Sequence, residues 1–150
     1  MEKWPRRISG AFLVGVAWAV VWAPIAILIG TTIVDPDNSM DEMWVMVGAL
    51  PGFLCGVLFC ALLGIREGHR RLDELPLPRA AAWGAVSGVL VGILPFVLGD
   101  QDGTERPLWI LPVVVICSLT LLGAVSAVGS ALVARRARKG APAVSPSTPR

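Results

Sequence analysis

Four long apolar runs without a single Asp, Glu, Lys, Arg or His constrain the fold of this chain more than any other feature. The runs cover residues 8–34, 43–65, 80–99 and 107–134. About 20 consecutive apolar residues cross the hydrocarbon core of a bilayer as a helix, so each run is long enough to span a membrane. The 150-residue chain is 55% hydrophobic and only 16% charged, and its charges collect between the runs. The sequence therefore predicts an all-α membrane protein with four transmembrane helices in residues 1–134.

A cleavable signal peptide is the competing interpretation of the first run. Lys3, Arg6 and Arg7 resemble a basic n-region, and the small residues at 17 and 19 fit a cleavage site. Apolar residues continue well beyond that site, however, whereas the apolar region of a signal peptide is short. We therefore interpret the first run as an uncleaved membrane span.

The positions of the basic residues predict an orientation in the membrane. All 13 Lys and Arg residues except Arg106 lie before residue 8, in the loop 66–79 or in the tail 135–150. Loops rich in Lys and Arg stay in the cytoplasm, which places both termini inside and the acidic loops outside. The tail is rich in Pro, Ser and Ala, which is typical of disorder, and its basic cluster predicts contact with anionic lipid. The abundance of Ala, Gly and Arg favours a bacterial cell-membrane protein.

Small residues recur at every fourth position along the runs. In the second run they are Gly48, Gly52, Gly56, Cys60 and Gly64, and in the third Ala80, Gly84, Gly88 and Gly92. The outer runs have shorter stripes, Ala11, Gly15, Ala19 and Ala23, then Gly123, Ala127 and Ala131. Residues four apart share one helix face, so another backbone can approach each stripe closely, as in a glycine zipper. The stripes predict one compact bundle. They leave open whether the second and third spans meet along these faces, and whether the stripes pack within one chain or between chains.

An internal repeat is the second organising pattern. Residues 11–71 align with residues 76–136 without gaps, which places Trp18 on Trp83 and Trp44 on Trp109. A D-x-D pair and a pair of adjacent arginines keep the same register. The alignment favours a parallel repeat of two hairpins related by an axis along the membrane normal. The alternative is that topology rules alone make the two hairpins similar.

Four prolines, one taken from each run, favour an external cavity. The four are Pro24, Pro51, Pro95 and Pro112, all in the outer half on the predicted orientation. Each removes a backbone hydrogen bond and tends to kink its helix, so the outer half could splay and leave a shallow cavity lined by Trp18 and Trp22. Membrane helices also tolerate proline well, and these tryptophans could instead face lipid or fill the bundle.

The search for metal or cofactor sites is largely negative. Cys55 and Cys60 point to different sides of a helix, and His69 has no neighbouring ligand, so neither forms a zinc or redox site. Four carboxylates in the acidic loops resemble the start of a calcium loop, namely Asp35, Asp37, Asp100 and Asp102. Neither loop has the closing Glu of an EF-hand, and turn formation explains the pattern without a metal. These four residues are weak metal candidates, and we expect no cofactor and no nucleic acid.

Three classes of function remain. The first, which we favour, is a noncatalytic protein of the lipid bilayer that packs with a second copy or with another membrane protein. The second is a passive conduit or binder for a small apolar molecule in the outer half; a cavity between the helices would favour it. The third is a membrane enzyme with its site on the loop 66–79. That loop offers Glu67, His69, Asp73 and Glu74 but no nucleophile, and the spans lack the buried ionisable groups that mark transporters.

Overall fold

The computed structural model describes residues 3–34, 41–67, 72–98 and 110–140, and every regular element in these ranges is helical. The elements are α1 (Lys3–Ile29), the π-helical turn η1 (Gly30–Val34), α2 (Asp41–Arg66), the 3-10 turn η2 (Leu72–Glu74), α3 (Leu77–Leu98) and α4 (Ile110–Gly140). Four of these helices are long and apolar enough to cross a membrane. The predicted all-helical chain with four such helices is confirmed.

Two helix boundaries differ from the prediction. α3 begins at Leu77 rather than at residue 80, because the carbonyl of Pro76 accepts the backbone N–H groups of Arg79 and Ala80 and starts the helix. Pro78 is tolerated in the first turn, where its missing N–H would have no intrahelical partner. α4 continues to Gly140, so the first residues of the predicted disordered tail are helical. Ala, Arg and Lys are good helix formers, and no proline intervenes there. The rest of the tail lies outside the described residues.

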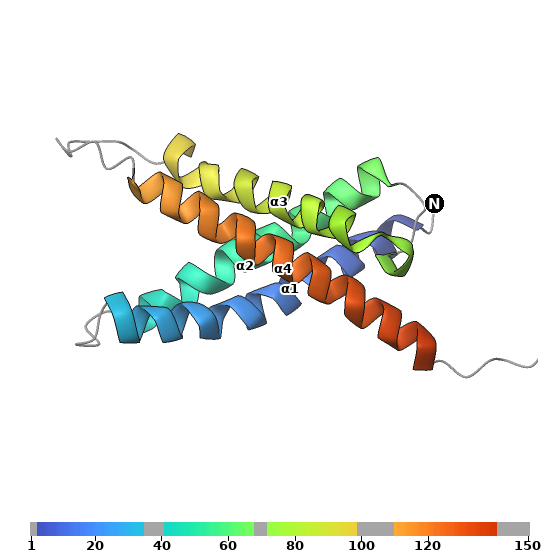
Figure 1. The fold of residues 1–150 in the computed structure, drawn as a ribbon, viewed down its shortest axis with the longest axis horizontal. Coiled ribbons are helices and arrows are strands. Elements are labelled where there is room, and N and C mark those ends of the chain that lie inside the picture. Colours follow the sequence, from blue (N-terminus) through green and yellow to red (C-terminus); the bar gives the residue numbers. More distant parts are fainter. Residues whose placement is uncertain (1–2, 35–40, 68–71, 99–109, 141–150) are drawn as a thin grey trace, which may run out of the picture.

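The helices pair as two hairpins that cross each other (Figure 1). α1 packs along α2 and α3 packs along α4, while the hairpins meet chiefly through α2 and α3. The ends of the hairpins that carry η1 and the start of α4 diverge toward the left of the view. Contact between the hairpins is therefore concentrated near the middle of the bundle.

The two glycine stripes lie in different interfaces and do not face each other. A Cβ on Gly56 would lie 2.8 Å from Cα of Gly15 in α1, and one on Gly48 would lie 2.7 Å from the carbonyl oxygen of Trp22. In the second hairpin, a Cβ on Gly84 would lie 2.8 Å from the carbonyl carbon of Gly123 in α4. Each stripe thus contacts the partner helix of its own hairpin.

The remaining stripe glycines complete this pattern with one exception. An added Cβ would lie 3.0 Å from the Trp22 ring at Gly52, 2.6 Å from the Leu119 carbonyl carbon at Gly88, and 3.1 Å from Cα of Ile116 at Gly92. At Gly64 it would meet no atom within 4 Å. Gly64 therefore stands outside the helix contacts of this chain.

The glycine contacts are not equivalent in the two halves, so the internal repeat stays a prediction. When residues 11–71 are aligned with residues 76–136, the contact between Gly15 and Gly56 falls on Ala80 and Leu121. In the structure Gly84 instead meets Gly123, whose equivalent in the first half is Leu58. The two helix pairs therefore pack in different registers.

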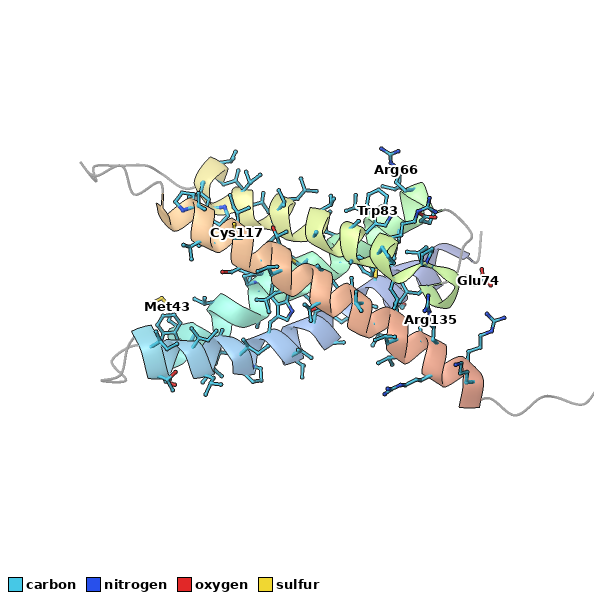
Figure 2. All side chains as sticks on the ribbon, in the orientation of Figure 1. Met43, Arg66, Glu74, Trp83, Cys117 and Arg135 are labelled. Carbon is cyan, nitrogen blue, oxygen red and sulfur yellow. The ribbon has the colours of Figure 1, made fainter. Side chains whose placement is uncertain are left out.

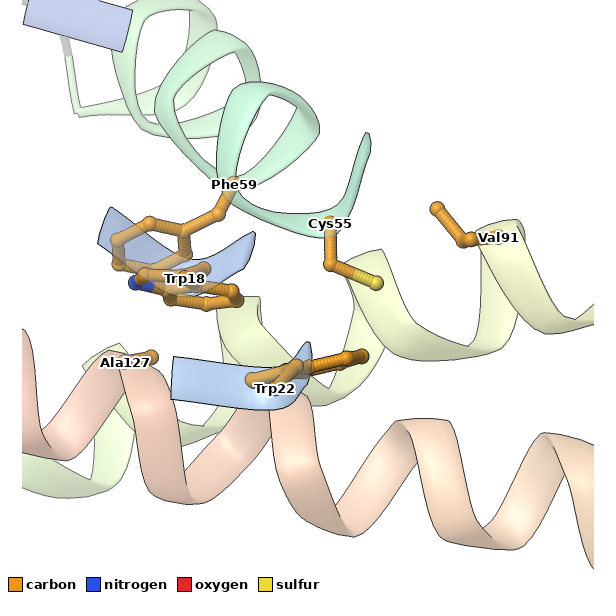
Figure 3. Packing of buried hydrophobic residues seen from close by; sticks show 6 residues of the cluster. All are labelled: Trp18, Trp22, Cys55, Phe59, Val91 and Ala127. Atoms are coloured by element: carbon orange, nitrogen blue, oxygen red, sulfur yellow. The ribbon is translucent and has the colours of Figure 1, made fainter. Parts of the chain in front are cut away.

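Large side chains fill the point where the hairpins cross (Figure 3). The buried cluster comprises Trp18, Trp22, Cys55, Phe59, Val91 and Ala127, drawn from all four helices. The outward faces remain apolar, with Leu13 67%, Leu121 68% and Val125 69% exposed. A soluble monomer rarely exposes so much contiguous apolar surface, whereas lipid tails cover it in a bilayer. Both features are those of a multi-pass membrane protein.

Candidate functional site: an apolar cleft between the hairpins

The end of the bundle at η1, here called the open end, contains a cleft of about 860 Å³ between the diverging hairpins. All four helices line this apolar cleft, with Trp22 from α1, Pro51 from α2, Pro95 from α3 and Leu122 from α4 among them. A cleft of this volume matches sites that enclose small molecules, which have volumes of about 300–1,000 Å³. Ser118 is the hydroxyl-bearing side chain in its wall.

The apolar cleft lies between two hairpins that are each tightly packed internally. Gly48 keeps α2 against α1, and Gly92 keeps α3 close to α4, so each hairpin stays closed at this end. The contacts of the described glycines at this end all stay within one hairpin. Pro51 and Pro95 also interrupt the backbone bonding of α2 and α3 beside the cleft. Because proline lacks an N–H, the carbonyls of Val47 and Val91 lose their usual helical donor.

Two stacked indoles close the bottom of the apolar cleft. The rings of Trp18 and Trp22 lie 6.1 Å apart at 20°, and each residue is only 3% exposed. Trp22 Nε1 donates to Ser126 Oγ at 2.9 Å, and Trp18 Nε1 donates to Ser130 Oγ at 3.1 Å. These bonds satisfy the buried indole groups and tie α1 to α4 across the hairpins.

The residues proposed from the sequence for an external cavity divide into two groups. Trp22, Pro51 and Pro95 line the apolar cleft, whereas Trp18 lies below it in the buried cluster. Pro24 is exposed on α1, and Pro112 lies in the first turn of α4, where its missing N–H costs no helical hydrogen bond. Of the four prolines, Pro51 and Pro95 thus stand beside the cleft, and the expectation of a kink at each proline stays a prediction.

Trp44 stands at the rim of the apolar cleft, and its indole N–H has no described partner. Its ring packs on Gly30 of η1, where any Cβ would overlap the ring. Its Nε1 is buried and has no hydrogen-bond partner among the described residues. An unsatisfied buried donor costs roughly 1–3 kcal/mol, so the open end is less completely packed than the rest of the bundle.

The opposite end of the bundle, here called the closed end, is covered by the short loop around η2. Leu75 is 1% exposed and packs with Ala80 and Ala131. Arg135 Nη2 donates to the carbonyl oxygen of Leu75 at 2.6 Å, which fastens the loop to α4. Arg135, predicted to face anionic lipid, therefore bonds to this loop.

Carboxylates of the loop 66–79 are also used in structural contacts. Arg79 Nη1 lies 3.7 Å from Glu67 Oε2, and Trp83 Nε1 lies 3.5 Å from Glu67 Oε1. Arg138 Nη1 lies 3.7 Å from Glu74 Oε1. His69 lies outside the described residues, so the loop shows no arrangement of a base beside a nucleophile in the part that is described.

Metal ligands do not gather anywhere in the described ranges: no three His, Cys, Asp or Glu residues there could hold one ion. The candidate carboxylates Asp35, Asp37, Asp100 and Asp102 lie outside those ranges. Cys55 is buried and its Sγ lies 3.8 Å from the carbonyl oxygen of Ser87. This contact joins α2 to α3 at the hairpin crossing.

The pairing of the tryptophans with serines was missed in the sequence. Trp18 and Trp22 are four residues apart on one helix face, and Ser126 and Ser130 are four apart on another. Two donors and two acceptors with the same spacing are a signal that could have been read. Comparison with known protein families, with curated proteins and with solved structures returned no match.

Proposed function

We propose that this chain is a noncatalytic multi-pass membrane protein that binds an apolar molecule in the apolar cleft. The observation that carries the proposal is the cleft itself, an open space of about 860 Å³ lined by all four helices. The described side chains of its wall are apolar apart from the Ser118 hydroxyl and the indoles of Trp22 and Trp44. Such a wall favours a long hydrocarbon chain, such as the acyl chain of a lipid or a fatty acid.

Assembly with other chains has weaker support from the packing. The glycine stripes were the reason to favour it, but six of the seven glycines contact the partner helix within the same hairpin. They leave no continuous small face for another molecule. Binding between the hairpins also explains why the open end diverges, which assembly through the stripes does not.

The ion pairs of two glutamates support a noncatalytic function. Glu67 faces Arg79, and Glu74 faces Arg138, at the end of the molecule away from the apolar cleft. Among the described residues, no ionisable side chain lines the cleft. A site without acid, base or nucleophile binds its ligand without transforming it.

The orientation of the protein follows from its charges. We propose that both termini are cytoplasmic in the cell membrane, because nearly all Lys and Arg residues flank that side. The apolar cleft then lies in the outer leaflet. Reporter fusions at Arg71 and Arg150 should read cytoplasmic, and fusions at Ser39 and Gly103 external.

A photoactivatable palmitate analogue tests the binding proposal. The full chain in detergent micelles is titrated with the probe, and labelled residues are mapped by mass spectrometry. We expect saturable labelling on the cleft wall, for example at Leu54 and Leu94. Ser118→Trp fills the cleft and should abolish the saturable component.

Leu121→Trp is the matched control, because it adds the same ring three residues further along α4 on an exposed face. It should leave labelling unchanged. Labelling that does not saturate, that falls equally on Leu121 and Val125, or that survives Ser118→Trp would show that the cleft holds no ligand.

A further inference from the structure

A second cavity of about 360 Å³ lies at the closed end, between the end of α2 and the start of α3. It is lined by Arg66, Glu67, Arg79, Ala82, Trp83 and Val86, and is here called the arginine pocket. Figure 2 shows Arg66 and Trp83 at the opposite end of the molecule from Met43, which marks the start of the second span. The arginine pocket is thus separate from the apolar cleft.

Among the described residues that line the arginine pocket, positive charges outnumber negative ones. Glu67 lies 3.7 Å from Arg79, and its side chain is 12% exposed, whereas that of Arg79 is 54% exposed. Arg66 also lines the pocket, is exposed, and forms no ion pair with a described residue. The described lining of the pocket therefore includes two arginines and one carboxylate, and both arginines are exposed.

The lining of the arginine pocket changes from charged residues at its opening to apolar residues further along α3. Arg66 ends the second candidate span, Met43–Arg66, and Arg79 is the third residue of the next one, Leu77–Leu98. The ends of membrane spans lie near the lipid headgroups, which is where we place both guanidinium groups. Ala82, Trp83 and Val86 follow within about two turns of α3 and form an apolar wall below them. A cationic opening above an apolar wall matches the order of groups along a phospholipid.

We propose that the arginine pocket binds the headgroup phosphate of an anionic phospholipid. Arg66 and Arg79 hold the phosphate oxygens through charge-assisted hydrogen bonds, for which the planar guanidinium is suited. Trp83 and Val86 contact the glycerol and the first part of an acyl chain. Basic pockets between membrane helices bind lipid headgroups in this way. The site is distinct from the basic end of α4, where Arg135 bonds to the carbonyl of Leu75.

Glu67 sets the strength of this binding. Its carboxylate forms an ion pair with the Arg79 guanidinium and repels a negatively charged phosphate. Glu67 therefore competes with the lipid phosphate for Arg79. Removing that charge should free Arg79 and tighten lipid binding. A purely structural role for the pair of Arg79 and Glu67 makes no such prediction.

The test measures binding of phosphatidylglycerol and of phosphatidylcholine to the purified full chain by native mass spectrometry. Phosphatidylglycerol should bind more tightly. Arg66→Gln should weaken its binding roughly fivefold, since one cation near a membrane surface contributes about 1 kcal/mol. Glu67→Gln should tighten it. Arg136→Gln, an exposed arginine on α4 outside the pocket, should leave it unchanged.

Arg66→Gln should fold like the wild type, because the side chain that it removes has no ion pair with a described residue. The melting temperature of this variant should therefore equal that of the wild type. The proposal is overturned if Arg66→Gln and Arg136→Gln weaken binding equally, or if Glu67→Gln fails to tighten it. It is also overturned if inorganic phosphate at equal concentration displaces phosphatidylglycerol, because the pocket would then recognise the free anion rather than the lipid.

Discussion

The two ends of the bundle are built from the same four helices but differ in how closely the two hairpins pack there. At the closed end, Leu75 lies over Ala80 and Ala131, and Arg135 fastens the loop to α4. At the open end no described residue joins the hairpins in this way, a cleft of about 860 Å³ remains, and the indole N–H of Trp44 has no partner among the described residues. Close packing within each hairpin is common to both ends. What differs, in the part of the chain that is described, is whether a side chain or loop joins the two hairpins.

This difference suggests a division of labour between stability and binding. Buried contacts at the closed end and at the hairpin crossing hold the hairpins together, and in the function proposed above the open end admits a ligand. In a membrane, helix association depends on packing and hydrogen bonds, because lipid tails are as apolar as the side chains. Contacts that join the hairpins should therefore matter more than apolar area at the open end.

The largest expected effect comes from breaking a hairpin, on which both ends depend. Gly84→Leu places its first added atom against the backbone of Gly123, which cannot rotate away. We expect a loss of about 3 kcal/mol, at the upper part of the usual range for overpacking. Unfolding by SDS in mixed micelles, followed by circular dichroism, measures it. Gly64→Leu is the control, since its Cβ meets nothing within 4 Å. Equal stability of the two variants would refute the packing role of the stripe.

The next effect distinguishes the ends directly. Leu75→Ala at the closed end removes a side chain that is 1% exposed and should cost about 2–3 kcal/mol by leaving a cavity. Leu98→Ala at the open end removes one that is 77% exposed and should cost almost nothing. The same SDS titration applies to both. The contrast between the ends fails if the two leucines prove equally important.

A smaller effect is expected from the bond that fastens the closed end. Arg135→Gln removes the charged donor to the Leu75 carbonyl and should destabilise the protein by about 1–2 kcal/mol. Hydrogen exchange should then rise first in the loop 72–76. Arg136→Gln, one residue along and exposed, is the control. Unchanged exchange in the loop would mean that Leu75 packing alone closes this end.

The smallest effect concerns the boundary between the ends. Ser126→Ala and Ser130→Ala each remove the acceptor of a buried indole N–H, at Trp22 and Trp18 respectively. Each leaves a buried indole donor unsatisfied and should cost about 1 kcal/mol. The coupling energy of one tryptophan–serine pair should be about 0.6 kcal/mol, the average for hydrogen bonds between membrane helices. A double-mutant cycle with Trp22→Phe isolates the pair, and Ser118→Ala is the control within α4. A coupling energy of zero would show that stacking, not hydrogen bonding, closes the cleft.

Much of the fold could be read from the sequence because apolar length and charge position are local properties. The absence of ionisable residues in four long runs was enough to predict four helices able to span a membrane. The end of α4 was misplaced because disorder was inferred from the composition of the whole tail. Its first residues, Arg135 to Gly140, favour helix, and Arg135 has a partner far away in the chain. Local patterns cannot show such a partner.

For the candidate site the sequence determined which small and aromatic residues lie on each helix, and the tertiary structure decided which helices those residues contact. Spacing by four residues showed that each glycine stripe permits a close approach, but not which helix approaches. The structure assigned each stripe to its own hairpin, and this choice left the space between the hairpins to Trp18, Trp22 and Phe59. Whether those large rings fill the crossing or line a cavity depends on the crossing geometry of helices that are distant in sequence. That geometry is a property of the whole packed chain, so it alone placed the apolar cleft at one end and closed the other.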